Sequence, residues 1–415
     1  MFSKYLKSSS VKSLIGSFLS LSILRGGQLV IPLITLPYLV NTIGLTKFGL
    51  ISYATALGMY FAAVIQYGFQ ITATRDIARA KLAGDENDIS QIYSLTFFSS
   101  LALSFISFLV FAGIVALVPS FSQYSILYFI VFLFLTSESI FPVWLFHGLE
   151  EMKYITYVNL SFKVLNLICI LLFIKVENDY MLVPILNLIF SFCSLIVSLY
   201  IIRFKFKLRF ILPNIHEVFS NLNVNRHAFI TQFAPNLYNN TTSFLLGLYF
   251  GNTVVGIYTA AIRIVEVFMS FGRIFVSTFL PFLSRKSDKF KSFLIFMLVV
   301  GAVFTLLLAL GSDFIAEYFY NDDGSIGNYI MLLSPWVFFI YARNAIGVNY
   351  LMLNGHEKLY SNIILYSSIF SFVVALYLIP NYEINGAISI IVFSSVLMFL
   401  LTFIALIRVS KNEQR

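Results

Sequence analysis

Apolar residues fill this chain in long runs that are separated by short polar segments. Each run is about 20 residues or longer, the length an α-helix needs to cross the ~30 Å hydrocarbon core of a bilayer. If each run is one span, the pattern predicts an all-α integral membrane protein with twelve transmembrane helices. Their approximate ranges are 14–40, 48–72, 91–118, 124–146, 154–174, 181–202, 227–250, 254–280, 292–311, 328–351, 359–379 and 386–407.

Composition supports a membrane protein and excludes several other classes. The chain is 59% hydrophobic and only 11% charged, whereas soluble domains have roughly 45–50% apolar residues. Both cysteines, Cys169 and Cys193, lie inside predicted spans, where cysteine acts mainly as a small apolar residue. The four histidines are scattered and form no metal-ligand pattern. We therefore predict no catalytic site, no metal site and no cofactor.

The positive charges predict an orientation in the membrane. Of the 27 Lys and Arg residues, 20 fall on the side of the N-terminus if the chain crosses twelve times. Lys47 and Lys175 fall on the other side, and the remaining five lie within spans. Because Lys and Arg concentrate in cytoplasmic loops, both termini are expected in the cytoplasm. The net charge of +8 is spread over short loops, which argues against a nucleic-acid partner.

A repeat divides the chain into two predicted halves. Gly44, Thr46 and Gly49 recur 207 residues later as Gly251, Thr253 and Gly256, and Gly148 and Glu150 recur at the same offset as Gly355 and Glu357. The basic segment from Arg203 to Arg226 separates the halves, which we place at residues 1–213 and 214–415. Parallel repeats of this kind are related by an axis along the membrane normal. We expect two six-helix bundles around a central cavity.

Seven ionisable side chains lie within the predicted spans. On insertion scales each costs about 2.5–3.5 kcal/mol at mid-depth, so they are expected to pair, to reach the surface or to face water. The net charge of the group is +3, a sign that favours an anionic cargo. The cations are candidate substrate-binding residues and the carboxylates candidate ion-coupling residues. These residues are Arg25, Lys163, Arg263, Arg273 and Arg343, with Glu138 and Glu266.

Arg263, Glu266 and Arg273 share one helix face, since they are spaced by three and seven residues. This face either lines a cavity for an anionic cargo, or it holds a structural Arg263–Glu266 pair while Arg273 reaches towards the cytoplasmic surface. Glu138 either pairs with a cation or carries a proton.

Lys163 lies on a stripe with Asn159 and Asn166 that faces either water or a neighbouring helix. Arg25 is either buried or at the cytoplasmic interface.

Several motifs resemble those of a known transporter family. The segments LPYL at 36–39, FG at 48–49, YGFQITATRDIAR at 67–79 and GIYTAAIRIVE at 256–266 are similar to O-antigen and related polysaccharide flippases. These flippases belong to the multidrug, oligosaccharidyl-lipid and polysaccharide exporter superfamily. The resemblance extends over the whole chain in its number of spans, its repeat and its loop lengths.

The resemblance implies a function in transport. The expected cargo is an undecaprenyl-diphosphate-linked oligosaccharide, moved by alternating access from the cytoplasmic to the outer leaflet of a bacterial inner membrane. Membrane lipids, a polysaccharide polymerase and a chain-length protein are the implied partners. One alternative is a cation-coupled multidrug antiporter of the same superfamily, although organic cations favour cavity carboxylates. The other is a polysaccharide polymerase, but the longest predicted outer loop, 312–327, is short and acidic.

Overall fold

The computed structural model describes residues 9–321 and 324–413, in which every regular element is helical. Side chains are described from Gly26 onwards except at 28, 29, 231, 234, 235, 237–239, 281, 287, 412 and 413, so the side chain of the predicted site residue Arg25 lies outside the description. The first elements are α2 (Ser9–Gln66), α3 (Phe69–Ala83), α4 (Glu86–Leu117), α5 (Pro119–Ser122), α6 (Ser125–Ile140), α7 (Val143–Gly148), α8 (Met152–Ile155), the π-helix η1 (Thr156–Leu160) and α9 (Ser161–Phe173). They are followed by η2 (Glu177–Met181), α10 (Leu182–Phe204), α11 (Ile215–Phe250), α12 (Asn252–Leu283), η3 (Ser287–Lys289), α13 (Phe290–Tyr320), α14 (Ser325–Leu333), α15 (Pro335–Ile346), the π-helix η4 (Gly347–Met352) and α16 (Glu357–Glu413).

Nine helical segments of the described chain are long and apolar enough to cross a membrane. Two of them, Val30–Ala83 and Glu357–Lys411, have 54 and 55 residues, more than twice the ~20 that one crossing needs. Each is interrupted by a non-helical residue, Gly44 in α2 and Glu383 in α16. Helix α11 is not among the nine because its many Asn and Gln side chains lower its hydropathy. The all-helical membrane class is confirmed, and the count of twelve stays a prediction.

Packing divides the chain into two compact units. Unit 1 comprises Met1–Thr35 and Leu57–Phe233, and unit 2 comprises Leu36–Ala56 and Ala234–Arg415. The predicted halves, 1–213 and 214–415, are defined by the sequence repeat, whereas the two units are defined by packing. The division into halves therefore stays a prediction. Segment 36–56, from the first half of the repeat, packs within unit 2.

The core of unit 1 forms where α3 packs against α7. Phe69, Ala73 and Ile77 recur every four residues, which places them on one face of α3, and all three are buried. Trp144 contributes the matching buried surface of α7. Gly148 ends α7 directly on this face, where an added Cβ would lie 2.7 Å from the Ile77 side chain. Close packing thus fixes the short helix α7 against α3.

The connection after α10 is bound to α4 through side-chain hydrogen bonds. Ser94 donates its hydroxyl to the Arg209 carbonyl at 3.1 Å and accepts the Ile211 amide at 2.9 Å. The Phe210 ring lies against Tyr93 and Phe97, with centroids 5.1 and 5.3 Å away. These bonds satisfy backbone groups that have no partner in a helix. The basic segment from Arg203 to Arg226, which separates the predicted halves, is therefore part of unit 1.

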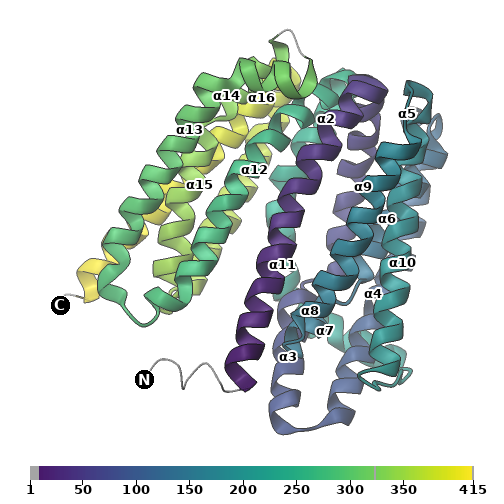
Figure 1. The fold of residues 1–415 in the computed structure, drawn as a ribbon, viewed down its shortest axis with the longest axis vertical. Coiled ribbons are helices and arrows are strands. Elements are labelled where there is room, and N and C mark those ends of the chain that lie inside the picture. The colour runs from purple at the N-terminus through teal and green to yellow at the C-terminus, as the bar shows by residue number, and fades with distance from the viewer. Residues whose placement is uncertain (1–8, 322–323, 414–415) are drawn as a thin grey trace. The chain divides into compact units, whose positions relative to one another are not determined.

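Unit 2 is built around Tyr341 of α15. Helices α13, α15 and α16 pack as neighbours in this unit, as Figure 1 shows. The Tyr341 hydroxyl donates to the Phe268 carbonyl of α12 at 2.8 Å. Glycines make room for its ring, because an added Cβ would lie 2.6 Å from Tyr341 at Gly272 and 3.0 Å from it at Gly301. One buried tyrosine thereby joins α12, α13 and α15.

The sequence repeat has a structural counterpart within unit 2. Gly44 and Gly251 both have positive φ and extended ψ (75° and 160°; 85° and −177°), a conformation that glycine adopts readily. Each begins a tight turn into the next helical run. The side chains of Thr46 and Thr253 meet, with their hydroxyl oxygens 2.9 Å apart. Residues related by the offset of 207 therefore contact each other.

At Gly49 and Gly256 the backbones of the two turns lie in direct contact. A Cβ at Gly49 would lie 1.8 Å from the Asn252 carbonyl oxygen, and one at Gly256 would lie 2.1 Å from the Leu45 carbonyl oxygen. Only hydrogen fits at either position. We call residues 44–49 and 251–256 the glycine–threonine clasp.

Adding one methyl group at Gly256 should push the two turns of the clasp apart. We expect Gly256→Ala to lower the stability of the purified protein by about 1–3 kcal/mol, the usual cost of overpacking, because the Leu45 carbonyl is backbone and cannot rotate away. Thermal unfolding in detergent measures this change. Gly113→Ala in α4 is the matched control, since no atom lies within 4 Å of its added Cβ. Equal melting temperatures for the two variants would contradict the close approach.

Candidate functional site

Two of the predicted site residues form an ion pair in unit 1. The Lys163 ammonium of α9 lies 3.5 Å from a carboxylate oxygen of Glu138 on α6. Both side chains are 38% exposed, so the pair is accessible rather than sealed in the core. For Glu138 the structure therefore shows the paired alternative. Charges that are open to their surroundings need water, since hydrocarbon would not solvate them.

The polar stripe around Lys163 divides between two roles. Asn166 donates to Asn187 of α10 at 2.6 Å, which makes this end of the stripe an interhelical hydrogen bond. Asn159 lies in the π-helical segment η1, one turn before Lys163. Such π segments occur frequently at functional sites because they change the direction of the side chains that follow. Lys163 is the member of the stripe that meets an opposite charge.

Unit 2 holds the second ion pair, on α12. The Arg263 guanidinium lies 2.8 Å from a Glu266 carboxylate oxygen, one helical turn apart. Arg273 donates to the hydroxyl of Ser270, which in turn donates to the Glu266 carbonyl at 2.8 Å. The Arg263 and Glu266 side chains are 48% and 36% exposed, so they remain open to a ligand. Arg263 and Glu266 thus meet on one face of α12, and Arg273 is linked to Glu266 through Ser270.

Arg343 of α15 occupies a more enclosed position in unit 2. It donates to the Met398 sulfur at 2.8 Å and to the Asn344 side-chain oxygen at 3.4 Å. Sulfur is a weak acceptor, so the hydrogen bond to Met398 is a weak one.

Unit 1 contains two helix breaks that the sequence analysis did not identify. The run from α2 to α3, expected to be continuous over 48–72, breaks at Tyr67 and Gly68, whose φ values are 44° and 78°. The run from α6 to α7, expected to be continuous over 124–146, breaks at Phe141 and Pro142. The signals were present in the sequence, because Gly68 permits positive φ and a proline ends the helix that precedes it.

A small polar pocket lies where these breaks meet. Residues at or beside both breaks line it, among them Phe69 and Phe141, together with Ser100 of α4 and Glu138. Its other polar side chains are Gln66, Gln70 and Ser139. Broken helices that enclose polar groups are typical of substrate and ion sites in membrane transporters. Glu138 thus belongs both to an ion pair and to a pocket.

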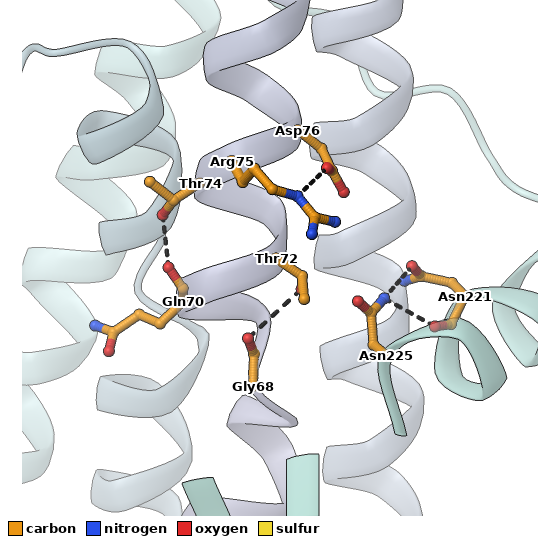
Figure 2. A network of polar contacts seen from close by, with 8 residues as sticks. All are labelled: Gly68, Gln70, Thr72, Thr74, Arg75, Asp76, Asn221 and Asn225. Atoms are coloured by element: carbon orange, nitrogen blue, oxygen red, sulfur yellow. Dashed lines mark hydrogen bonds and ion pairs between the residues drawn. The ribbon is translucent and has the colours of Figure 1, made fainter. Parts of the chain in front are cut away.

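The motif of α3 serves mainly to hold helices together. Thr74 donates to the Gln70 carbonyl at 2.7 Å and lies 3.2 Å from the Trp144 carbonyl of α7. Figure 2 shows the Thr74–Gln70 bond together with two other contacts of this segment, Thr72 with the Gly68 carbonyl and Arg75 with Asp76 at 2.9 Å. The Arg75–Asp76 pair is well exposed, and such pairs contribute little to stability. The motif accordingly positions α3 and α7 next to the pocket.

The chain has an all-helical membrane-transporter fold whose two units each carry an accessible ion pair. Residues 14–287 match the model of a protein family described as polysaccharide biosynthesis protein, and the chain belongs to that family. Two relatives are candidate O-antigen transporters. The one from Escherichia coli (strain K12) is 25% identical over 89% of this chain and 91% of its own length. The one from Shigella dysenteriae is 26% identical over 92% and 98%.

Solved structures with the same fold are transporters and a flippase. A multidrug resistance MATE family transporter of the MOP superfamily, in an inward-facing conformation, superposes with a TM-score of 0.67 at 13% identity, covering 95% of this chain and 99% of that one. The lipid II flippase MurJ, in an inward closed conformation, gives 0.67 at 13% identity over 94% and 87%. At this identity the likeness concerns the fold alone. Together with the family match, it confirms the resemblance stated from the sequence.

Proposed function

We propose that this protein flips an undecaprenyl-diphosphate-linked oligosaccharide from the cytoplasmic to the outer leaflet of a bacterial inner membrane. The observation that carries the proposal is that this chain, a member of the polysaccharide biosynthesis family, has more cations than carboxylates among the charged side chains of its apolar helices. Lys163, Arg263 and Arg273 all lie on helices that are long and apolar enough to cross a membrane, and the seven charges within the predicted spans sum to +3. A cationic lining attracts a diphosphate and repels cations. The names of the two relatives, both candidate O-antigen transporters, support the same cargo class.

Each charged residue has a distinct part in this mechanism. Arg263 and Arg273 bind phosphate oxygens, since a guanidinium matches them with two parallel hydrogen bonds. Lys163 and Arg343 add positive charge along the path, and Arg25 adds a further cation near the predicted cytoplasmic end. Glu266 holds Arg263 in place until the cargo competes for it, and it remains a candidate for ion coupling.

The proposed architecture is twelve spans in two bundles, with both termini in the cytoplasm. The interruptions at Gly44 and Glu383 support this count because each long helix can turn back there. The cargo then lies between the bundles and is exposed to each leaflet in turn. A polymerase and a chain-length protein act on the cargo after it is released, and the flippase itself carries out no covalent step.

A cation-coupled multidrug antiporter is the second candidate, supported by the MATE-like fold. Organic cations need carboxylates that are free to bind them. Both intramembrane carboxylates, Glu138 and Glu266, are already paired with cations here. The charge balance therefore favours the diphosphate cargo.

Removing the α12 cations should stop flipping while leaving the protein in the membrane. We expect Arg263→Ala and Arg273→Ala to reduce surface glycan by roughly ten- to a hundredfold, the value of a charged hydrogen bond. Lysine at either position should rescue only partly, because it keeps the charge and loses the two-pronged geometry. The assay is surface glycan in a strain lacking its own copy of the gene, alongside membrane protein level. Lys291→Ala, which removes an exposed charge outside α12, is the control.

A double variant separates cargo binding from structural pairing. If Arg263 served only to neutralise Glu266, the uncharged combination Arg263→Gln with Glu266→Gln would restore flipping. We expect it to remain as inactive as Arg263→Gln alone, with normal protein level. Restored glycan in the double variant would contradict a role for Arg263 in binding.

Alternating access requires the glycine–threonine clasp to open and close. With Cys169 and Cys193 replaced by alanine, a Thr46→Cys and Thr253→Cys pair should oxidise to a disulfide, because the two threonine hydroxyls lie 2.9 Å apart. We expect the oxidised protein to lose flipping and to regain it on reduction. The single-cysteine variants are the controls. Full activity in the cross-linked protein would show that the clasp does not move during transport.

A further inference from the structure

The connection that follows α10 carries a charge pattern that the proposed function leaves unused. Its sequence from 203 to 210, RFKFKLRF, alternates cations with apolar residues. Leu208 is buried, and the Phe206 ring lies against that of Tyr154 with their centroids 5.4 Å apart. All four cations are exposed. We call them the basic edge of unit 1, and its members are Arg203, Lys205, Lys207 and Arg209.

Hydrogen bonds hold the backbone of the basic edge in place. The Lys205 amide donates to the Ile201 carbonyl of α10 at 2.9 Å. The Ser94 hydroxyl of α4 binds the backbone on both sides of Phe210. A segment held in this way has little conformational freedom left to lose when a ligand binds to it. The cations are therefore preorganised for binding.

Positive charge accumulates around the ring of Tyr154. The ammonium groups of Lys205 and Lys153 lie 4.9 and 5.4 Å from its centroid. The carboxylate of Glu151, 2.7 Å from the Lys153 ammonium, balances the charge of that lysine. No member of the basic edge forms an ion pair with a carboxylate of the described chain. Such an excess of positive charge attracts an anionic ligand.

Large apolar side chains flank the basic edge and identify the kind of ligand. Phe204, the last residue of α10, is 65% exposed, and Leu212 beyond the edge is 81% exposed. The segment Glu177–Phe204 is apolar enough to cross a membrane, so the basic edge begins where a candidate span ends. A dissolved anion would leave both apolar side chains in water. The boundary between lipid headgroups and acyl chains accepts apolar and basic groups together.

We propose that the basic edge binds the phosphate groups of anionic glycerophospholipids, with Phe204 and Leu212 among the acyl chains. Clusters of about four to eight cations directly after a membrane span are typical of anionic-lipid recognition. The hydrogen bonds to Ser94 keep these cations next to the end of α10. The site is built from unit 1 and uses none of the candidate cargo cations. Lipid composition therefore changes the stability of the protein with or without a cargo.

The test titrates phosphatidylglycerol against phosphatidylcholine in mixed micelles of the purified full-length protein, at constant total lipid, pH and ionic strength. A lipid that binds the folded state raises the melting temperature until its site is saturated. We expect this rise with phosphatidylglycerol. Replacing Lys205, Lys207 and Arg209 together by glutamine should weaken the apparent affinity by at least about tenfold. Lys205→Arg combined with Lys207→Arg keeps both charges and should bind as the wild type does.

A matched control separates a built site from a general attraction of lipid to positive loops. Lys286, Lys289 and Lys291 are exposed residues of unit 2, and their joint replacement by glutamine removes the same charge. We expect this variant to respond to phosphatidylglycerol as the wild type does. An equal loss of affinity in the two triple variants would overturn the proposal. An equal response of the wild type to the two lipids would overturn it as well.

The apolar contribution is tested without altering any charge. Leu212→Ser should weaken the affinity roughly three- to tenfold, because it removes an apolar side chain from the acyl region. Leu117→Ser, at an 84% exposed position where α4 ends, is the control and should have no effect. Unfolding of each variant in phosphatidylcholine alone shows whether the fold is intact. If the triple variant of the basic edge does not fold, the Leu212 variant and its control decide the question, and unchanged affinity in Leu212→Ser contradicts the proposal.

Inorganic phosphate tests for a soluble ligand at the same cations. We expect no stabilisation by phosphate at the concentrations at which phosphatidylglycerol saturates its effect. If phosphate stabilises the wild type as strongly as phosphatidylglycerol does, and the triple variant of the basic edge loses both responses, the cations bind a dissolved anion and the assignment to a lipid is wrong.

Discussion

The cost of a charge in hydrocarbon is the constraint on which this structure depends. An ionisable group costs about 2.5–3.5 kcal/mol at mid-depth on insertion scales, and the chain carries seven of them within its apolar runs. Two opposite-charge pairs, Lys163–Glu138 and Arg263–Glu266, reduce that cost where they occur. Exposed ion pairs contribute little to stability, so folding alone does not explain why these charges are present. Their accessibility instead suits a role in binding a charged ligand.

Backbone hydrogen bonding imposes a second demand that the same elements satisfy. In lipid, irregular backbone is tolerated only where protein or water supplies partners. Residues beside the breaks at Gly68 and Pro142 line a polar pocket, and the turns that begin at Gly44 and Gly251 meet through Thr46 and Thr253. Irregular backbone in this molecule therefore coincides with candidate sites of binding or movement.

The fold class could be predicted from the sequence because it follows from apolar run length, which physics ties directly to bilayer thickness. The repeat in the glycine and threonine turns was equally visible, and the Thr46–Thr253 contact gives it a physical meaning. Helical spacing placed Arg263 and Glu266 on one face and left their pairing as one of two alternatives, and the structure shows the pair. The pairing of Glu138 with Lys163 could not be predicted, because it joins two helices and depends on tertiary packing. The pocket was missed for the same reason, and because a continuous apolar run conceals a break of one or two residues.

The central claim is that the protein translocates a lipid through recognition of its diphosphate by cations. Its most direct test is flipping by the purified protein in liposomes. An isoprenoid-diphosphate-linked oligosaccharide is compared with the same oligosaccharide on a neutral lipid, and arrival in the opposite leaflet is followed with a membrane-impermeant reagent. We expect the protein to accelerate translocation of the diphosphate-linked cargo and to leave the neutral glycolipid close to the protein-free rate. Equal acceleration of both lipids, or of neither, would contradict the account.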